Sequence, residues 1–171
     1  MSQAAFQAAL ERATSRLKAS SEYRLTLGGG NLAPGRNPTL CDPHLAQFWQ
    51  VYATPASIYE DSRIAARLPT LAPAVLLFAT LAERVGCELG IAAMNYGRMQ
   101  AADLPGLVGQ VDIFAREGDD LVPLSGRHLL DLRSRLIQAS SNHGRLALLA
   151  EIPEADWQEC NLDDLPLASP Q

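Results

Sequence analysis

The stretch QVDIFAREGDDLVPLSGRHLLDLRSRLI, from Gln110 to Ile137, decides the fold class that we expect for this chain. Side chains alternate with a period of two over residues 111–116, which is typical of a strand. Residues 117–120 (Glu-Gly-Asp-Asp) have turn chemistry, because glycine adopts positive φ without steric cost and aspartate tolerates it. A short second strand ends at Pro123, which has no N–H to donate to a ladder. The stretch therefore predicts a β-hairpin.

An amphipathic helix is expected directly after this hairpin. Ser125 stands where an N-cap residue is expected, because its hydroxyl can accept a bond from a first-turn N–H. The apolar residues that follow form one wide stripe at helical spacing: Leu129, Leu130, Leu132, Leu136 and Ile137. Neither the hairpin nor the helix specifies any chemistry.

The rest of the chain extends this pattern into a single α+β domain. Periodicity predicts helices over residues 3–19, 44–53, 57–68 and 74–85, and strands over 23–27, 87–94 and 146–152. Residues 28–43 and 95–109 are expected to be irregular, 142–144 a turn, and 155–160 one helical turn. Helices in the first half and strands in the second favour a mainly antiparallel sheet packed against several helices. We expect this domain to span residues 1–160, with a flexible acidic tail over 161–171.

Composition narrows the class of protein. The 171 residues suit one domain, and 47% hydrophobic with 19% charged residues is typical of a globular protein. The three cysteines have no CxxC spacing, which argues against a disulfide framework and for a reducing compartment. Neither a signal-peptide pattern nor a membrane-length apolar run occurs, so we expect a cytoplasmic protein without a membrane partner.

The negative charge is concentrated near the C-terminus. The net charge is −5, and residues 146–171 contain six acidic residues with no lysine or arginine. An acidic chain is a poor nucleic-acid ligand, since phosphate contacts dominate that affinity. This segment instead suits a partner protein with a basic surface. In this segment the residues predicted to bind the partner are Glu154, Asp156, Trp157, Asp163 and Asp164.

Two irregular regions offer further binding candidates. Gly28, Gly29 and Gly30 follow a predicted strand, and such a loop with Arg36 could hold a phosphate or another small ligand. No helix follows at once and no Lys-Ser/Thr pair occurs, so a flexible loop is the favoured interpretation. Tyr96 and Arg98 combine residue types that are frequent at interface hot spots, and they extend the predicted partner-binding surface.

Cysteine and histidine supply the candidate catalytic chemistry. Cys41 lies three residues before His44, a spacing that could form a nucleophile–base pair. Cys41 could also act with His128 and an aspartate, provided that the fold brings them together. Two ligands do not complete a zinc site, so we expect neither a metal nor a cofactor.

These observations favour a non-catalytic protein-binding module. In a bacterial cytoplasm this class includes accessory, chaperone-like and toxin-neutralising immunity proteins. One alternative is a small enzyme with Cys41 as nucleophile and a nearby histidine as base. Another is a small-ligand sensor that uses the Gly28–Gly30 segment. A homodimer is left open.

Overall fold

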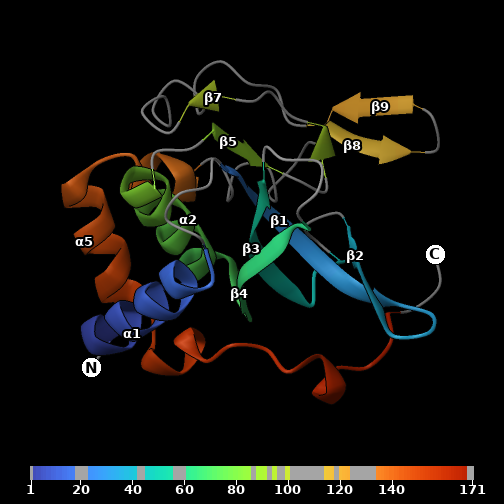
Figure 1. Ribbon diagram of the computed structural model, residues 1–171, viewed down its shortest axis with the longest axis horizontal. Helices are drawn as coiled ribbons and strands as arrows, with labels where there is room; N and C mark the ends of the chain where they lie inside the picture. The colour runs from blue at the N-terminus through green and yellow to red at the C-terminus, as the bar shows by residue number, and fades with distance from the viewer. Residues whose placement is uncertain are drawn as a thin grey trace.

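The computed structural model describes residues 2–17, 23–41, 45–55, 61–85, 88–91, 94–95, 99–100, 114–117, 120–123 and 134–168. Within these ranges a larger sheet has the strand order β4-β3-β1-β5-β7, and β2 also pairs with β1 (Figure 1). Its strands are β1 Tyr23–Ala33, β2 Asn37–Leu40, β3 Phe48–Pro55, β4 Arg63–Leu68, β5 Glu88–Ile91 and β7 Met99–Gln100. The β1–β5 pair is parallel and the other pairs are antiparallel.

A smaller antiparallel sheet contains β6 Met94–Asn95, β8 Phe114–Glu117 and β9 Asp120–Pro123. Strands β8 and β9 form the hairpin expected from the sequence, with Glu117 paired to Asp120 across two intervening residues. The predicted helix after this hairpin is confirmed over 134–137 and continues to residue 139, whereas residues 124–133 lie outside the described ranges.

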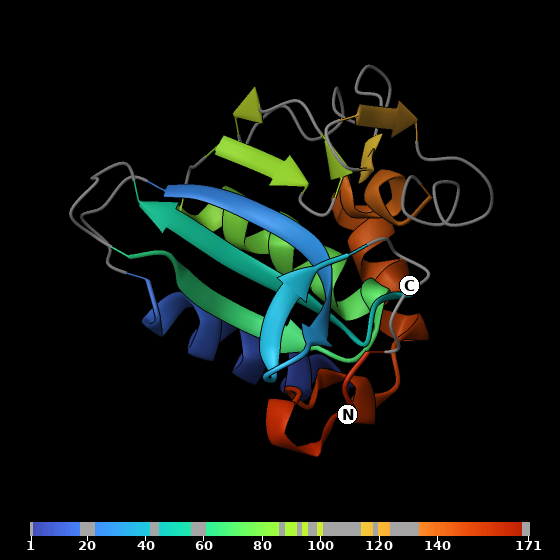
Figure 2. The same cartoon turned by 90° about the vertical axis from the view of Figure 1, so that its right-hand side faces the viewer.

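Helices cover one face of the larger sheet (Figure 2). They are α1 Ser2–Ser15, α2 Leu71–Val85 and α5 Asn142–Glu151, and the one-turn 3₁₀ helices η3 Glu154–Trp157 and η4 Leu162–Asp164 follow them. Both α1 and α2 contact the sheet, and α5 contacts α1 and α2. The α+β class with a mainly antiparallel sheet is therefore confirmed.

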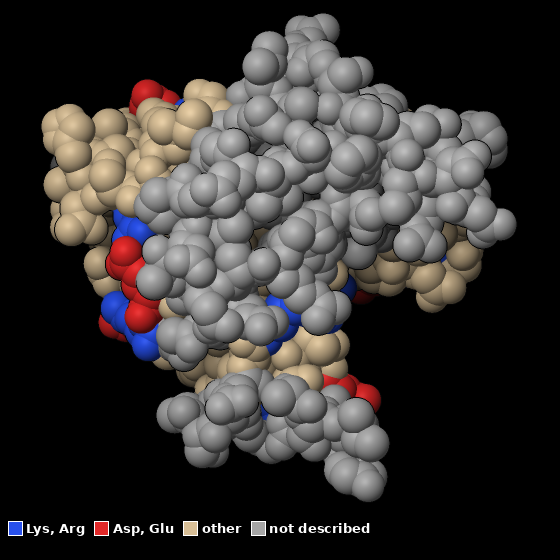
Figure 3. Space-filling view, turned by 90° about the horizontal axis from the view of Figure 1, so that it is seen from above, with Lys and Arg blue, Asp and Glu red and all other residues tan. Residues whose placement is uncertain are grey.

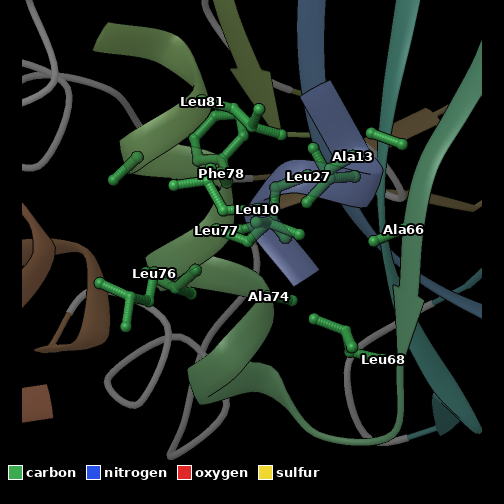
Figure 4. Packing of buried hydrophobic residues seen from close by; sticks show 14 of the residues in the cluster. Leu10, Ala13, Leu27, Ala66, Leu68, Ala74, Leu76, Leu77, Phe78 and Leu81 are labelled. Atoms are coloured by element: carbon green, nitrogen blue, oxygen red, sulfur yellow. The ribbon is translucent and has the colours of Figure 1, made fainter. Parts of the chain in front are cut away.

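The core lies between α1, α2 and the sheet (Figure 4). Leu10 of α1, Leu27 of β1 and Phe78 of α2 are among its fully buried side chains. Helix α2 is apolar on nearly all sides, as its sequence predicts, because it packs between the sheet and the other helices.

Two predicted helices are wrong. Residues 48–55 form β3 and residues 63–68 form β4. The apolar spacing in 44–53 fits a helix, but the same residues also alternate. Trp49, Val51 and Ala53 face the helix-side core, whereas Phe48 and Gln50 lie on the opposite face. Pairing with β1 along eight residues decides between these two periods, which local propensity does not.

The predicted turn at 142–144 and strand at 146–152 are also wrong, because α5 spans Asn142–Glu151. Ser141 is its N-cap, and the Ser141 hydroxyl accepts a 3.0 Å bond from the Gly144 N–H. Leu148 and Leu149 are buried, and the alanine- and leucine-rich sequence has high helix propensity.

The predicted irregular region at 28–43 is mostly a β-hairpin. Strand β1 continues through Gly28, Gly29 and Gly30 and pairs with β2 across a turn in which Gly35 and Arg36 have positive φ. A Cβ on Gly30 would lie 2.5 Å from Cε2 of the fully buried Phe48 ring. Glycine is required there because an aromatic ring from β3 occupies the space of a side chain.

Candidate partner-binding surface

Residues 158–168 form an extended segment that we call the C-terminal strap. It runs along the lower side of the molecule in Figure 1, from α1 towards β2, and is drawn in red. The strap contains η4 and follows η3 directly. Contacts at both of its ends determine where its acidic side chains lie.

The first anchor joins the strap to α1 and β4. Glu159 Oε2 accepts a 3.0 Å bond from Arg16 Nη2 and lies 3.4 Å from Arg12 Nε. The Cys160 N–H donates a 2.9 Å bond to the Arg67 carbonyl, on the outer edge of β4. Burial raises the pKa of Glu159, but the Arg16 hydrogen bond and the charges of Arg16 and Arg12 outweigh burial and hold that pKa below its usual range.

Arg36 provides the second anchor. Its Nη2 donates to the carbonyl oxygens of Leu162 and Leu165, the latter at 2.9 Å. The positive φ of Arg36, 63°, is unusual for a non-glycine residue and belongs to the β1–β2 turn. The Arg36 guanidinium, which we expected to bind a small ligand, is thus hydrogen-bonded to the carbonyl end of η4.

Gln47 completes this anchor by bridging the strap and the sheet. Its Nε2 donates a 2.7 Å bond to the Pro166 carbonyl, and its Oε1 accepts a 2.9 Å bond from the Leu32 N–H. The Ala168 N–H also donates a 2.8 Å bond to the Leu32 carbonyl. The strap is therefore bonded to the main chain of β1 near its C-terminal end.

Asp163 and Asp164 lie between the two residues whose carbonyls Arg36 binds, and both are exposed. Asn161 begins η4, since its Oδ1 accepts a 3.1 Å bond from the Asp163 N–H. Among the described residues, no basic side chain forms an ion pair with Asp163 or Asp164. The strap consequently presents two adjacent carboxylates to solvent from a hydrogen-bonded backbone.

The other predicted residues of this surface differ in accessibility. Glu154 is exposed on η3, whereas Asp156 is partly buried and its Oδ2 accepts a 3.2 Å bond from the Thr70 hydroxyl. Trp157 is only 2% exposed, and its ring centroid lies 5.1 Å from that of Phe6. Its indole therefore belongs to the core in this structure, and the predicted contact of Trp157 with a partner stays a prediction.

A shallow hollow of 260 Å³ lies beside Asp156, between the start of α2 and the end of α5. Arg135 and Glu151 line it and form an ion pair of 2.8 Å across its wall. The hollow contains both signs of charge, so its lining alone does not select a ligand.

The predicted domain boundary at residue 160 and the flexibility of the tail stay predictions. Residues 161–168 have defined hydrogen bonds to β1, Arg36 and Gln47, and residues 169–171 lie outside the described ranges.

The catalytic candidates are only partly covered by the structure. Cys41 is partly buried, and its N–H donates a 3.0 Å bond to the Gly29 carbonyl. His44 and His128 lie outside the described residues, so their proximity to Cys41 stays a prediction. Burial raises the pKa of the Cys160 thiol, which does not favour a thiolate there. No group of three or more His, Cys, Asp or Glu side chains able to hold a metal ion occurs within the described ranges.

The loop candidates have different outcomes. The expectation of a glycine loop is wrong, because Gly28, Gly29 and Gly30 pair with β3 inside the sheet. Tyr96 and Arg98 lie outside the described residues, so their part in a recognition surface stays a prediction.

Comparison of the chain with family models, with curated proteins and with solved structures gave no match in any of the three. No helix in the described part of the chain has the length and apolar character needed to cross a membrane.

The Glu159 anchor predicts a pH dependence of stability. The pKa of Glu159 in the folded protein lies below its unfolded value of about 4.3. The Glu159 carboxylate therefore stabilises the fold above about pH 4.3, and this stabilisation is lost as pH falls through the folded pKa. In urea unfolding between about pH 5 and pH 3, Glu159→Gln should lose less stability than the wild type. Glu11→Gln, on the exposed side of α1, is the matched control. Equal losses in Glu159→Gln and the wild type would contradict the anchor.

Proposed function

We propose that this protein is a non-catalytic protein-binding module that docks a partner with a basic surface onto its C-terminal strap. The observation that carries this proposal is the exposure of Asp163 and Asp164 on a strap bonded to the domain at both ends.

Charge distribution supports a partner of basic character. Of the six acidic residues in 146–171, Glu151 pairs with Arg135, and Glu159 pairs with Arg16. Of the other four, Asp163 and Asp164 are exposed on the strap. Acidic and basic side chains are interspersed along one flank of the molecule (Figure 3), so their fields partly cancel there. Arg12, Arg16 and Arg36 contact the strap and offset part of its negative charge, and the net charge of the chain, −5, still favours a basic partner.

Pre-organisation supports binding through this segment rather than mere solubility. A flexible acidic tail would lose backbone and side-chain entropy when it docks. The strap's backbone is already hydrogen-bonded to Arg36, Gln47 and Leu32, so Asp163 and Asp164 are presented at defined positions at a smaller entropic cost.

The test is a comparison of the wild type with the double variant Asp163→Asn/Asp164→Asn. Tagged wild-type protein is used to capture partners from cells of the source organism, and a captured partner is then purified for calorimetric titration. We expect the double variant to bind it about tenfold more weakly at 50 mM salt, since exposed charge pairs contribute about 0.2–1 kcal/mol each. The difference should shrink at 300 mM salt through screening.

The matched control is Glu11→Gln/Asp61→Asn, which removes the same charge from exposed positions outside the strap. We expect it to bind within about twofold of the wild type. The proposal fails if no specific partner is captured, or if both double variants bind alike.

A further inference from the structure

Several polar side chains lie on the face of the larger sheet that points away from α1 and α2. The register places Thr26 opposite Tyr52, Gly28 opposite Gln50, and Gln50 opposite Arg67. Directly opposed residues project to the same face of a sheet, and residues two apart on one strand do so as well. Arg24, Thr26, Gln50 and Arg67 therefore share this face, which we call the polar sheet face.

Two polar atoms of this face are buried without a hydrogen bond. Thr26 is 0% exposed, and its Oγ1 has no partner in the part of the chain that the structure describes. The same holds for Nε of Arg24, two residues earlier on β1. A buried donor left unsatisfied is costly, so each such group in a native protein calls for an explanation, of which a bound water or ion is one.

Two arginines of this face, Arg24 and Arg67, carry positive charge, and the register of β1 with β5 places Glu88 opposite Arg24. Arg67 Nε donates a 3.2 Å bond to Oε1 of Gln50, which is neutral, and its guanidinium carbon lies 5.7 Å from the centroid of the Phe48 ring. Burial lowers the pKa of Arg67. Among the side chains that the structure describes, no carboxylate forms an ion pair with Arg67. Partly desolvated guanidinium groups without an anion are unfavourable, because burial of a charge is tolerated chiefly when it is paired.

Gly28 separates the two halves of this arrangement. It lies two residues from Thr26 along β1 and opposite Gln50 on β3, and it contributes no side chain. The Thr26 hydroxyl and the Gln50–Arg67 pair are therefore neighbours on the sheet without an intervening side chain from β1.

We propose that the polar sheet face is a binding site for a small oxyanion, a carboxylate or a phosphate group. Arg67 would supply charge and a planar set of donors, and Thr26 a hydroxyl donor. This site lies on β1, β3 and β4, and the carboxylates of the strap take no part in it.

The test measures the midpoint of thermal unfolding of the full chain in sodium phosphate and in citrate, against sodium chloride at equal ionic strength. Titration calorimetry measures the binding of each anion. We expect at least one of the two anions to raise the midpoint saturably, and the responding anion tells phosphate from carboxylate chemistry. Thr26→Val keeps the side-chain shape, and we expect it to weaken binding of the responding anion about tenfold, as for one lost hydrogen bond to a charged group. Arg67→Met should abolish the rise.

Arg84→Met is the matched control, because Arg84 is an exposed arginine of α2 and its loss changes the net charge equally. It should keep the full response. Circular dichroism confirms folding, and Thr26→Val carries the test if Arg67→Met does not fold. The proposal is overturned if neither anion raises the midpoint beyond chloride, or if Thr26→Val responds as the wild type does.

Discussion

Replacing Gly144 by alanine is expected to lower the free energy of unfolding by about 1–3 kcal/mol, as overpacking of a filled site does. A Cβ on Gly144 would overlap the carbonyl oxygen of Gln138 and lie 2.8 Å from its carbonyl carbon. Both are backbone atoms, so relief requires moving the chain that enters α5. Alanine is a better helix former than glycine by about 1 kcal/mol, and this gain is smaller than the expected clash.

Urea unfolding of Gly144→Ala and of His143→Ala checks this prediction. His143 is exposed in the same helical turn, and its replacement should change stability by no more than about 0.5 kcal/mol. If Gly144→Ala were instead more stable by about 1 kcal/mol, helix propensity would govern the site. Gln138 would then not lie against Gly144 as described.

The elements predicted correctly are those whose signals are local. The hairpin of β8 and β9 follows from its turn residues, and α2 follows from an apolar pattern that fits only a buried helix of its length. In both cases the residues that decide the structure are within one element or its turn. The sequence was therefore sufficient to predict the fold class.

The elements predicted wrongly depend on partners far away in the sequence. Residues 48–52 fit both a helical and an alternating period, and only pairing with β1 selects the strand. The glycines at 28–30 suggest a loop until the Phe48 and Trp49 rings are placed against them. Neither contact can be inferred from local spacing.

The candidate surface shows the same division. The sequence shows that acidic residues are concentrated near the C-terminus, but it does not show that hydrogen bonds hold this segment against the domain. Arg36 and Gln47 lie more than a hundred residues before the carbonyl groups that they bind on the strap. The polar sheet face had a local signal that was missed, since Arg24, Thr26 and Gly28 alternate with Leu25 and Leu27. An alternating strand with arginine on its second face indicates that this face is not simply core.

Truncation of the buried indole, Trp157→Ala, should have the largest effect of the variants considered, about 3–5 kcal/mol of unfolding free energy. Trp157 packs against Phe6 of α1, and the two rings are tilted by 44°. Two residues later Glu159 pairs with Arg16, which directly follows the C-terminal end of the same helix. Loss of the indole therefore removes core volume at the point where η3 holds the start of the strap against α1. Gln158→Ala, at the exposed neighbouring position, should remain within about 0.5 kcal/mol of the wild type in the same urea unfolding experiment.

The milder variant Trp157→Phe separates a core role from a partner-contact role. It keeps an aromatic ring against Phe6, so we expect it to fold with a loss smaller than that of alanine. If Trp157 is a core residue, the folded phenylalanine variant should bind the partner nearly as the wild type does, while Asp163→Asn/Asp164→Asn binds more weakly at unchanged stability. An interface hot spot would behave in the opposite way, with at least about 2 kcal/mol lost from binding and little from folding. Such a result would require the indole to leave the core when the partner docks, and the strap would then be a segment that rearranges on binding.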